Sequence, residues 1–415
     1  FTTLDWPTKS YELSKFYPSN VLVTGFDIIF FWVARIMMMG SYFMKETPFK
    51  DIYIHPLIRD EYGKKMSKSK GNIIDPLTLL DKYGADTLRF TLTALLNPGR
   101  DVKLSESRVK GYKSFTNKIW NAANFLQINK CHFYDNIELD LIKLDMNKWI
   151  IKELNNVLEL SDEYINKYLF HEYANHIYHF VWHSYCDWYI EFIKSSLKNP
   201  DTSKETKNVA GWVFVQILKL IHPVMPFISE KLWNKLVNQS DYLILQKFSK
   251  QNIPHNFLHS KKNIQYVIDI ITSIRNLRAE LNIPYKININ LFIDCKNEDI
   301  ESFLFKFHEE IKRMLKIDEI KYEKLLTKKN TAFIVLSDLS IVIPLVDIVD
   351  TKTEINKLNI KKELEHSKLL KIENKLNNDS FLEKAPKNVV EDFKTQANEL
   401  KSSIEKIDQI INTIN

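Results

Sequence analysis

Apolar residues recur at helical spacing through the middle of the chain. From about Leu104 to Leu258 this pattern predicts several long amphipathic helices. Long helices joined by short connections are typical of a helical bundle. The expected helices are Ser107–Asn129, Met146–Leu169, His171–Leu197, Lys207–Val237 and Lys262–Leu281.

The last part of the chain, 351–415, carries a heptad pattern instead. Its apolar residues step 3, 4, 3, 4 at Val390, Phe393, Ala397, Leu400, Ile404, Ile407, Ile411 and Ile414. The preceding stretch, Ile355 to Leu376, is apolar at its ends and is interrupted by Lys362 and Glu365. A polar turn at 377–380 separates the two, so we expect an antiparallel helical hairpin. The pattern alone leaves a dimerising coiled coil as the alternative.

Two further regions mix strands with helices. Residues 285–350 predict a small α+β module, with strands at Ile287–Asp294, Ala332–Leu336 and Leu339–Ile348 and a helix at Ile300–Leu315. Near the N-terminus, a short strand at Val21–Thr24 is followed by Gly25 and a helix from Asp27 to Gly40. A second strand is expected at Asp51–Ile58 and a further helix at Asp81–Leu96. Strand, glycine and helix in this order predict a ligand at the carboxyl end of a parallel strand.

Asp27 has two interpretations at this turn: the N-cap of the helix, or an acceptor for a ribose or an amino group. Ile28 and Trp32 lie four residues apart, so an α-helix would place them on one face. They predict either core packing or the wall of a small apolar pocket.

Composition bounds the remaining possibilities. With 415 residues, the chain is long enough for two to four domains. Its net charge of +6 permits nucleic-acid binding without requiring it. Three cysteines that lie far apart, without a CxxC pair, indicate a reducing compartment rather than a disulfide framework. The apolar run Val21–Phe43 contains Asp27 and Arg35, so we expect a buried strand and helix rather than a membrane span. Phe1 is not a plausible natural start, and we expect a chain truncated at its N-terminus.

The strongest candidate for chemistry is the lysine-rich loop, Gly63–Asn72, which reads GKKMSKSKGN. Asp75 and Pro76 follow as a good N-cap and a good first helical residue, so a mobile basic loop leads into a helix. Lysines and loop amides suit a polyanion. An ordinary solvated loop is the alternative.

KMSKS at 65–69, followed by Gly71 and Asn72, resembles the second signature of class I aminoacyl-tRNA synthetases. The segment VLVTGFDIIFFWVARIMMMG (21–40) is similar to the corresponding segment of the valyl-tRNA synthetases. The first resemblance implies that the loop closes over the triphosphate of ATP, with Lys65 and Lys68 catalytic. It implies the ATP-binding residues Lys65, Met66, Ser67, Lys68 and Ser69. The second implies an amino-acid and adenylate pocket formed by Gly25, Asp27, Ile28 and Trp32.

Segments further along the chain carry the same resemblance. Residues 182–194 and 222–233 resemble the anticodon-binding bundle of valyl, isoleucyl and leucyl enzymes, and 381–393 resembles the tip of the valyl coiled-coil arm. The implied fold is multidomain, α/β plus all-α. The C-terminal half of a Rossmann-type catalytic domain occupies 1–103. A helical anticodon-binding bundle (104–284), a small α+β linking module (285–350) and an antiparallel coiled-coil arm (351–415) follow.

The implied function is the ATP-dependent attachment of L-valine to tRNA(Val). ATP with Mg²⁺ serves as a substrate, and we expect no protein-bound metal, no membrane partner, a monomer and a cytoplasmic location. The alternatives are an isoleucyl or leucyl relative and a noncatalytic tRNA-binding protein. The HxGH signature is not among these residues. We therefore expect it upstream, together with the editing domain, and expect residues 1–415 alone to activate valine poorly or not at all.

Two other patterns in the bundle region have simpler explanations. His176, His179 and His183 share one helical stripe, but a helical zinc site usually adds a carboxylate or a cysteine. Trp182, Tyr185, Trp188 and Tyr189 could stack on bases, although aromatic residues at helical spacing more often belong to the core.

Overall fold

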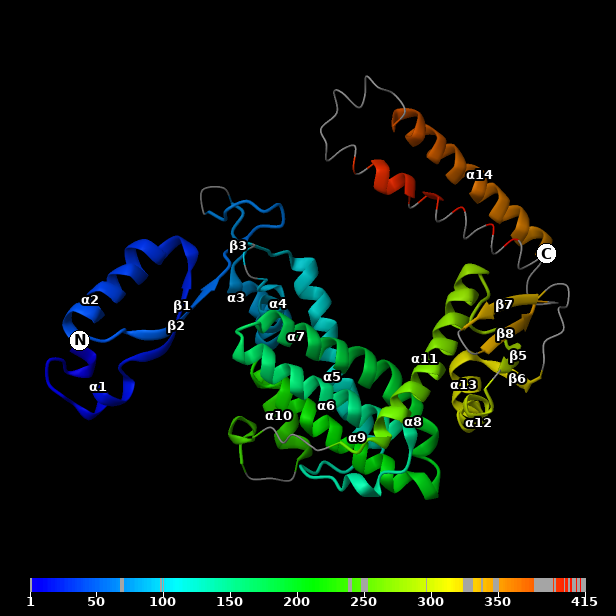
Figure 1. Cartoon of the computed structure of the whole chain (residues 1–415), viewed down its shortest axis with the longest axis horizontal. Coiled ribbons are helices and arrows are strands. Elements are labelled where there is room, and N and C mark those ends of the chain that lie inside the picture. The colour runs from blue at the N-terminus through cyan, green and yellow to red at the C-terminus, as the bar shows by residue number, and fades with distance from the viewer. Residues whose placement is uncertain are drawn as a thin grey trace. The chain divides into compact units, whose positions relative to one another are not determined.

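The computed structural model divides the chain into two compact units, Phe1–Lys261 and Lys262–Asn415 (Figure 1). The structure describes residues 2–67, 71–97, 99, 101–237, 241–247, 253–295, 297–323, 331–336, 339–345 and 351–376, and single positions and short runs between 391 and 411. Short 3-10 turns lie at Thr2–Leu4, Leu139–Leu141 and Leu243–Leu245.

The first unit begins with the expected strand and glycine. After α1 (Tyr11–Phe16), strand β1 (Ser19–Gly25) pairs in parallel with β2 (Phe49–His55). The connection consists of a 3-10 turn at Phe26–Ile28, a π-helix at Ile29–Val33 and helix α2 (Ala34–Met44). The register pairs Gly25 with His55, so both strands end at the same edge.

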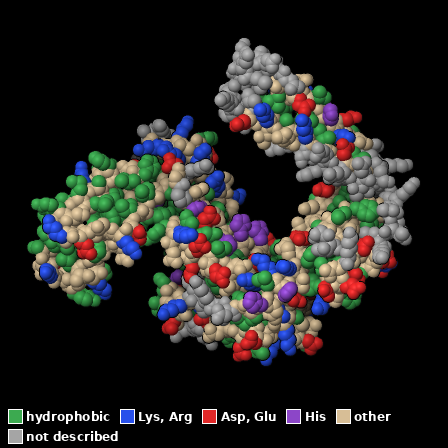
Figure 2. Space-filling model, viewed as in Figure 1, with side chains coloured by type: hydrophobic (Ala, Val, Ile, Leu, Met, Phe, Trp, Pro, Cys, Tyr) green, Lys and Arg blue, Asp and Glu red, His purple; other side chains and the backbone are tan. Residues whose placement is uncertain are grey.

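The expectation that this apolar run is buried is wrong for the described residues. Phe30 is 86% exposed and Met38 is 71% exposed, and Figure 2 shows hydrophobic side chains across the surface of this segment. The run Phe26–Met44 is long and apolar enough to cross a membrane by length and composition, and 11% of its most apolar window is buried. The two-stranded sheet and the short α1 are too small to cover both faces of this helix.

The lysine-rich loop follows β2 and a short strand, β3 (Ile58–Arg59), which pairs in parallel with β4 (Val102–Lys103). Beyond the loop lie α3 (Pro76–Tyr83) and α4 (Ala85–Leu95). The single helix expected at Asp81–Leu96 is therefore wrong. Gly84 breaks it with a φ of +85°, a conformation that glycine adopts without steric cost.

The helical bundle forms as the periodicity predicts, with one interruption. Its helices are α5 (Glu106–Ile128), α6 (Asp145–Asn166), α7 (Phe170–His179), α8 (Ile190–Ser196), α9 (Pro200–Ile221) and α10 (Pro226–Leu236). The single helix predicted at Lys207–Val237 is wrong, because it ends before Pro223 and restarts with Pro226 in its first turn.

A π-helix, Phe180–Tyr189, continues α7 into α8 and carries the four aromatic residues noted in the sequence. Tyr185 and Tyr189 are fully buried, as a core assignment predicts. Trp182 and Trp188 are only half-buried. Trp182 stacks on Tyr178 and lies beneath the Lys118 ammonium at 4.0 Å from the ring centre.

The division between the two units falls within α11 (Asn256–Glu280). The second unit continues with a four-stranded mixed sheet in the order β6-β5-β8-β7 and two helices. These elements are β5 (Ile289–Cys295), α12 (Glu298–Lys306), α13 (His308–Leu315), β6 (Ile317–Tyr322), β7 (Thr331–Val335) and β8 (Leu339–Pro344). Phe307 separates α12 from α13, so the single helix expected at Ile300–Leu315 is wrong, and the pattern also missed β6.

The second unit ends in a helical pair formed by α14 (Thr351–Leu376) and the helical residues described between 391 and 411. Lys362 pairs with Asp408, and Glu373 pairs with Lys401 at 2.9 Å. The partner of the later residue in α14 therefore comes earlier in the second helix, which makes the pair antiparallel. Lys362, which interrupts the apolar pattern of the first helix, is thus used in a contact between the two helices.

Candidate active site around the lysine-rich loop

A tight turn fixes the start of the lysine-rich loop. The backbone N–H of Gly63 donates to the carbonyl of Asp60 at 2.9 Å, and the N–H of Asp60 donates to the carbonyl of Lys64 at 3.1 Å. Gly63 has a φ of +83°, which favours glycine at this position. Lys65 then forms an antiparallel bridge with Arg59, so the backbone of the first loop lysines is tied to β3.

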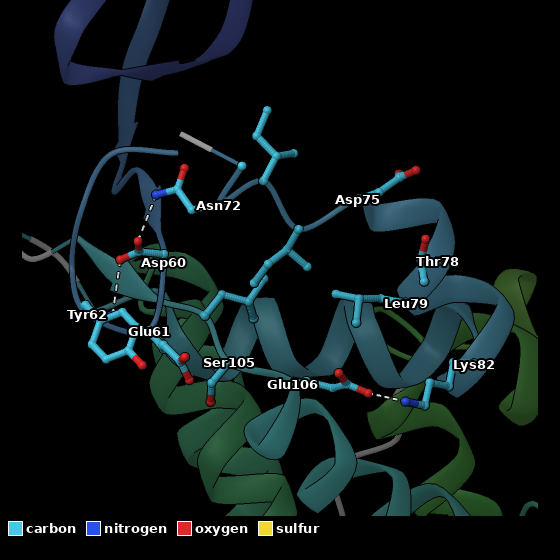
Figure 3. Close-up of a pocket in the computed structure, with 14 residues that line it drawn as sticks. Asp60, Glu61, Tyr62, Asn72, Asp75, Thr78, Leu79, Lys82, Ser105 and Glu106 are labelled. Carbon is cyan, nitrogen blue, oxygen red and sulfur yellow. Dashed lines mark hydrogen bonds and ion pairs between the residues drawn. The ribbon is translucent and has the colours of Figure 1, made fainter. Parts of the chain in front are cut away.

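The side chain of Asp60 organises both ends of the loop, although it is not among the residues that sequence reasoning selected. Its Oδ1 accepts from the N–H of Lys64 at 2.7 Å and from that of Tyr62 at 3.1 Å. Its Oδ2 accepts from Asn72 Nδ2 at 2.8 Å, as Figure 3 shows. The hydrogen bond from Asn72, followed by those from the two backbone N–H groups, lowers the pKa of the Asp60 carboxyl.

Asn72 completes this network at the far end of the loop. Its Oδ1 accepts from the N–H of Ser67 at 3.0 Å, and its Nδ2 also lies 3.3 Å from the carbonyl of Lys65. The residue that ends the motif therefore folds back onto the start of the loop. Asn72 was visible in the sequence as the last residue of the lysine-rich segment, but nothing in the sequence indicated that its side chain binds Asp60.

The helix after the loop begins as the sequence predicts. Asp75 is the N-cap of α3 and its Oδ1 accepts from the N–H of Leu77 at 2.9 Å, while Pro76 occupies the first turn. The loop is therefore held between a turn on one side and a capped helix on the other.

A cavity of about 600 Å³ lies between the loop, α3 and the start of α5 (Figure 3). Its lining includes the carboxylates of Asp60, Glu61, Asp75 and Glu106, and Glu106 pairs with Lys82. So many carboxylates disfavour a triphosphate, so this cavity is a poor ATP site. The carboxyl edge of β1 and β2 does not contribute to its lining.

That carboxyl edge brings together Gly25, Asp27 and His55. Gly25 is buried, and a Cβ on it would lie 2.6 Å from Asp27 Oδ1 and 3.6 Å from His55 Cε1. Gly25 itself holds the N-cap position of the following turn, so the N-cap interpretation of Asp27 is wrong. Asp27 is exposed and remains available to a ligand. His55 is half-buried, and its Nδ1 lies 3.0 Å from the carbonyl of Pro56.

Ile28 and Trp32 do not share the face of an α-helix, because a 3-10 turn and a π-helix replace the α-helix at these positions. Trp32 instead lines an apolar cavity of about 430 Å³ with Phe31, Arg35 and Tyr17. Ile28 is not part of that lining. A valine pocket formed by both residues stays a prediction.

Of the predicted ATP-binding residues, Lys65, Met66 and Ser67 lie in the described part of the loop. Lys65 is exposed, and Met66 and Ser67 are half-buried. Lys68 and Ser69 lie outside the described residues. Their roles stay predictions.

The histidine stripe in the bundle does not converge on one point. His176 is half-buried against Tyr164, and burial lowers its pKa. His179 and His183 are exposed and stack on each other with ring centres 5.6 Å apart. Among the residues that the structure describes, no group of three His, Cys, Asp or Glu side chains could hold a metal ion.

Comparison with known proteins agrees with this arrangement. The family model for class I tRNA synthetases (I, L, M and V) matches residues 1–105, and that for the anticodon-binding domain of tRNA ligases matches 147–293. The model for the tRNA-binding arm of valyl-tRNA synthetases matches 350–415. A valine–tRNA ligase from Pelagibacter ubique is 41% identical over 412 residues, which cover 98% of this chain. The chain is thus similar to valine–tRNA ligases along almost its whole length.

A second valine–tRNA ligase, from Fervidobacterium nodosum, is 41% identical over 418 residues and aligns with all of this chain. The chain spans just under half the length of both relatives, 47% in each case. Both relatives are valine–tRNA ligases, and the matched arm model is that of valyl-tRNA synthetases.

Proposed function

We propose that this protein attaches L-valine to tRNA(Val) in an ATP-dependent reaction, through a valyl-adenylate intermediate. The observation that carries the proposal is the 41% identity with a valine–tRNA ligase along almost the whole chain. The match of the C-terminal segment to the valyl arm supports the choice of valine.

In this proposal each segment has a separate task. Residues 1–103 belong to a Rossmann-type catalytic domain, and 104–284 form the anticodon-binding bundle. Residues 285–350 link the bundle to a coiled-coil arm, 351–415, which contacts the tRNA. The antiparallel order of the ion pairs in the arm supports a hairpin closed within one chain. We propose that the protein acts as a monomer.

The first reaction step joins valine to AMP. The carboxylate of valine attacks the α-phosphorus of ATP, a new O–P bond forms, and pyrophosphate leaves with the electrons of the broken bond. Such phosphoryl chemistry needs little acid–base work from the protein and depends on positioning and charge stabilisation. In the second step a hydroxyl of the terminal tRNA ribose attacks the carbonyl of the adenylate, and AMP leaves.

The residues of the lysine-rich loop stabilise the charge of the triphosphate in the first step. Lys65 and Lys68 supply positive charge, and Ser67, Ser69 and the backbone at Met66 supply hydrogen bonds. The donor set fits a polyanion, since lysine ammonium groups bind phosphate as mobile point charges. Mg²⁺ enters with ATP as part of the substrate and neutralises phosphate charge when bound.

The amino acid binds at the carboxyl edge of β1 and β2. Gly25 leaves room for the Asp27 carboxylate. Asp27 accepts from the amino group of valine, and Ile28 and Trp32 contact its side chain. The exposed carboxylate of Asp27 next to the buried Gly25 supports this assignment. An apolar pocket of this kind distinguishes one methylene by only about 1–3 kcal/mol.

The test compares two lysine variants of the native protein that contains these residues. Lys68→Ala removes a loop charge, whereas Lys50→Ala removes an exposed charge from β2 as a matched control. We expect Lys68→Ala to slow valine-dependent ATP–pyrophosphate exchange by about 100-fold to 1,000-fold, as loss of one transition-state contact does elsewhere. Its affinity for tRNA should stay nearly unchanged.

Lys50→Ala should leave both quantities unchanged. A noncatalytic tRNA-binding protein would give the opposite result: no dependence of any activity on Lys68, with tight, salt-sensitive tRNA binding. Exchange that is equally fast in Lys68→Ala and in the wild type would contradict the proposed role of the loop.

A further inference from the structure

The two ends of the lysine-rich loop are joined by side chains rather than by a regular ladder. Asp60 and Asn72 are twelve positions apart and meet through the Nδ2–Oδ2 hydrogen bond of 2.8 Å (Figure 3). The short bridge at Arg59 and Lys65 reaches only the first part of the loop. Among the described residues, Asn72 therefore connects the second part of the loop to Asp60, just before the loop.

We propose that Asp60 and Asn72 form a clasp, a pair of positioning residues that joins the two ends of the loop at its base and holds Lys65 in position for the triphosphate. The clasp rests on the proposed function, because it acts through the lysines of that site. Neither residue is itself placed in contact with substrate.

Two hydrogen bonds other than that from Asn72 orient the Asp60 carboxylate. Its Oδ1 is held by two backbone N–H groups, and the residue is only 7% exposed. Oδ2 is therefore directed toward Asn72, and hydrogen bonds to a charged acceptor are stronger than those between neutral groups. An alternative partner for Oδ2 would require the turn at 60–64 to open.

Asn72 uses both ends of its amide. The Nδ2 group donates to Asp60, and Oδ1 accepts from the N–H of Ser67, one residue before Lys68. A flip of the Asn72 amide would exchange its oxygen and nitrogen and would break these hydrogen bonds. The amide therefore fixes the backbone immediately before Lys68 as well as the base of the loop.

Such a clasp affects catalysis through position. A displacement of about 1 Å in a charge that stabilises the transition state costs about 100-fold in rate. Free loop ends would let Lys65 sample more positions. The proposed pocket for valine lies elsewhere, at the carboxyl edge of β1 and β2. Loss of the clasp should therefore lower kcat for activation and leave KM for valine nearly unchanged.

The experiment is a reciprocal exchange of the two side chains in the native protein that contains these residues. Asn72→Asp places two carboxylates face to face, and Asp60→Asn leaves the donor of Asn72 without its charged acceptor. The double variant D60N/N72D restores the pattern. Its amide at position 60 can donate to the carboxylate at position 72, and that carboxylate can still accept from the N–H of Ser67. Glu61→Gln is the matched control, since Glu61 is exposed beside the same cavity and its replacement removes the same charge.

We expect Asn72→Asp to lower kcat of valine-dependent ATP–pyrophosphate exchange by about 100-fold, with KM for valine within about twofold. The kcat of D60N/N72D should be at least about tenfold higher than that of Asn72→Asp. A gain of this size corresponds to the coupling energy seen between residues in contact. Glu61→Gln should behave as the wild type. A double variant that is no better than the product of the two single effects would overturn the clasp, as would single variants with unchanged exchange.

Trypsin cleavage after the loop lysines provides a readout that does not depend on activity. We expect faster cleavage in both single variants and slower cleavage again in D60N/N72D. That pattern supports the clasp even if the wild type shows no valine-dependent exchange, a result that would overturn only the proposed function. Equal cleavage in all variants would overturn the clasp.

Discussion

At the scale of single residues, Gly211 in α9 is the most tightly enclosed of the glycines. The loop after α5 crosses the helix here, and the N–H of His132 donates to the carbonyl of Lys207 at 3.3 Å. A Cβ on Gly211 would lie 1.9 Å from the backbone oxygen of His132. Backbone cannot move aside as a flexible side chain can, so only glycine allows this approach.

Gly211→Ala should therefore destabilise the protein by at least about 3 kcal/mol, because overpacking against backbone exceeds the gain in helix propensity. Gly111→Ala is the control, since Gly111 is exposed in α5 and a Cβ there meets nothing within 4 Å. It should stabilise the protein by about 0.5–1 kcal/mol. Urea unfolding of both variants measures the difference, and shifts of the same sign would contradict this account.

The residues of the candidate site were predictable to different degrees for physical reasons. Asp75 and Pro76 were assigned correctly because capping depends on local sequence alone. The contact between Asp60 and Asn72 was not predicted, because it joins two residues across a loop and loops carry no periodic pattern from which such a contact could be inferred. The sequence left two interpretations open for Asp27, and the N-cap interpretation is excluded because Gly25 takes that position two residues earlier.

At the scale of elements, a buried carboxylate joins α4 to α10. Asp86 in α4 accepts from the N–H groups of Phe227 and Ile228 in the first turn of α10, at 3.1 and 2.6 Å. Arg89, one turn later, donates to the carbonyl of Pro223 at 3.1 Å. Helix α4, which follows the loop and α3, thereby holds both sides of the turn before α10.

Asp86→Ala should lower the free energy of unfolding by about 2 kcal/mol, because it leaves buried N–H groups at a helix start without an acceptor. Asp81→Ala, at an exposed position in α3, is the control and should have little effect. Thermal unfolding followed by circular dichroism compares the two variants. Equal midpoints would show that the contact does not stabilise the joint.

The pH dependence of this joint has a definite sign. Burial raises the pKa of the Asp86 carboxyl above 3.8, although the N–H groups of α10 act in the opposite direction. The folded protein therefore holds this proton more tightly than the unfolded chain does. The stability that protonation contributes is fully present below the ordinary pKa and is lost as the pH rises through the folded value. As the pH falls toward 3.8, the thermal unfolding midpoint of the wild type should rise relative to that of Asp86→Asn, because only the wild type gains stability from protonation at this position.

The sequence predicted the type of most elements but not where they break. Long periodic helices such as α5 and α6 begin and end within a few residues of the expected positions, because their apolar faces pack throughout. The breaks at Gly84, at Pro223 and Pro226, and at Phe307 depend on one or two residues each, and the helical period continues across them. Strand β6 was missed because its pairing with β5 is set by tertiary contacts rather than by alternation alone.

At the scale of the whole molecule, the segments of the chain serve one proposed reaction. The heptad spacing together with the polar turn at 377–380 predicted an antiparallel pair of helices, and the turn itself lies outside the described residues. Local sequence patterns were enough to predict the lysine-rich loop, the carboxyl edge and the arm. The exposure of α2 was not predicted, since burial depends on which other elements cover a helix.

The most direct test of the central claim is the amino-acid specificity of charging by the native protein that contains these residues. We predict ATP-dependent attachment of valine to tRNA(Val), with isoleucine and leucine attached far more slowly under the same conditions. Attachment of isoleucine or leucine in preference to valine would contradict the account. Tight tRNA binding without attachment of any amino acid would contradict it as well.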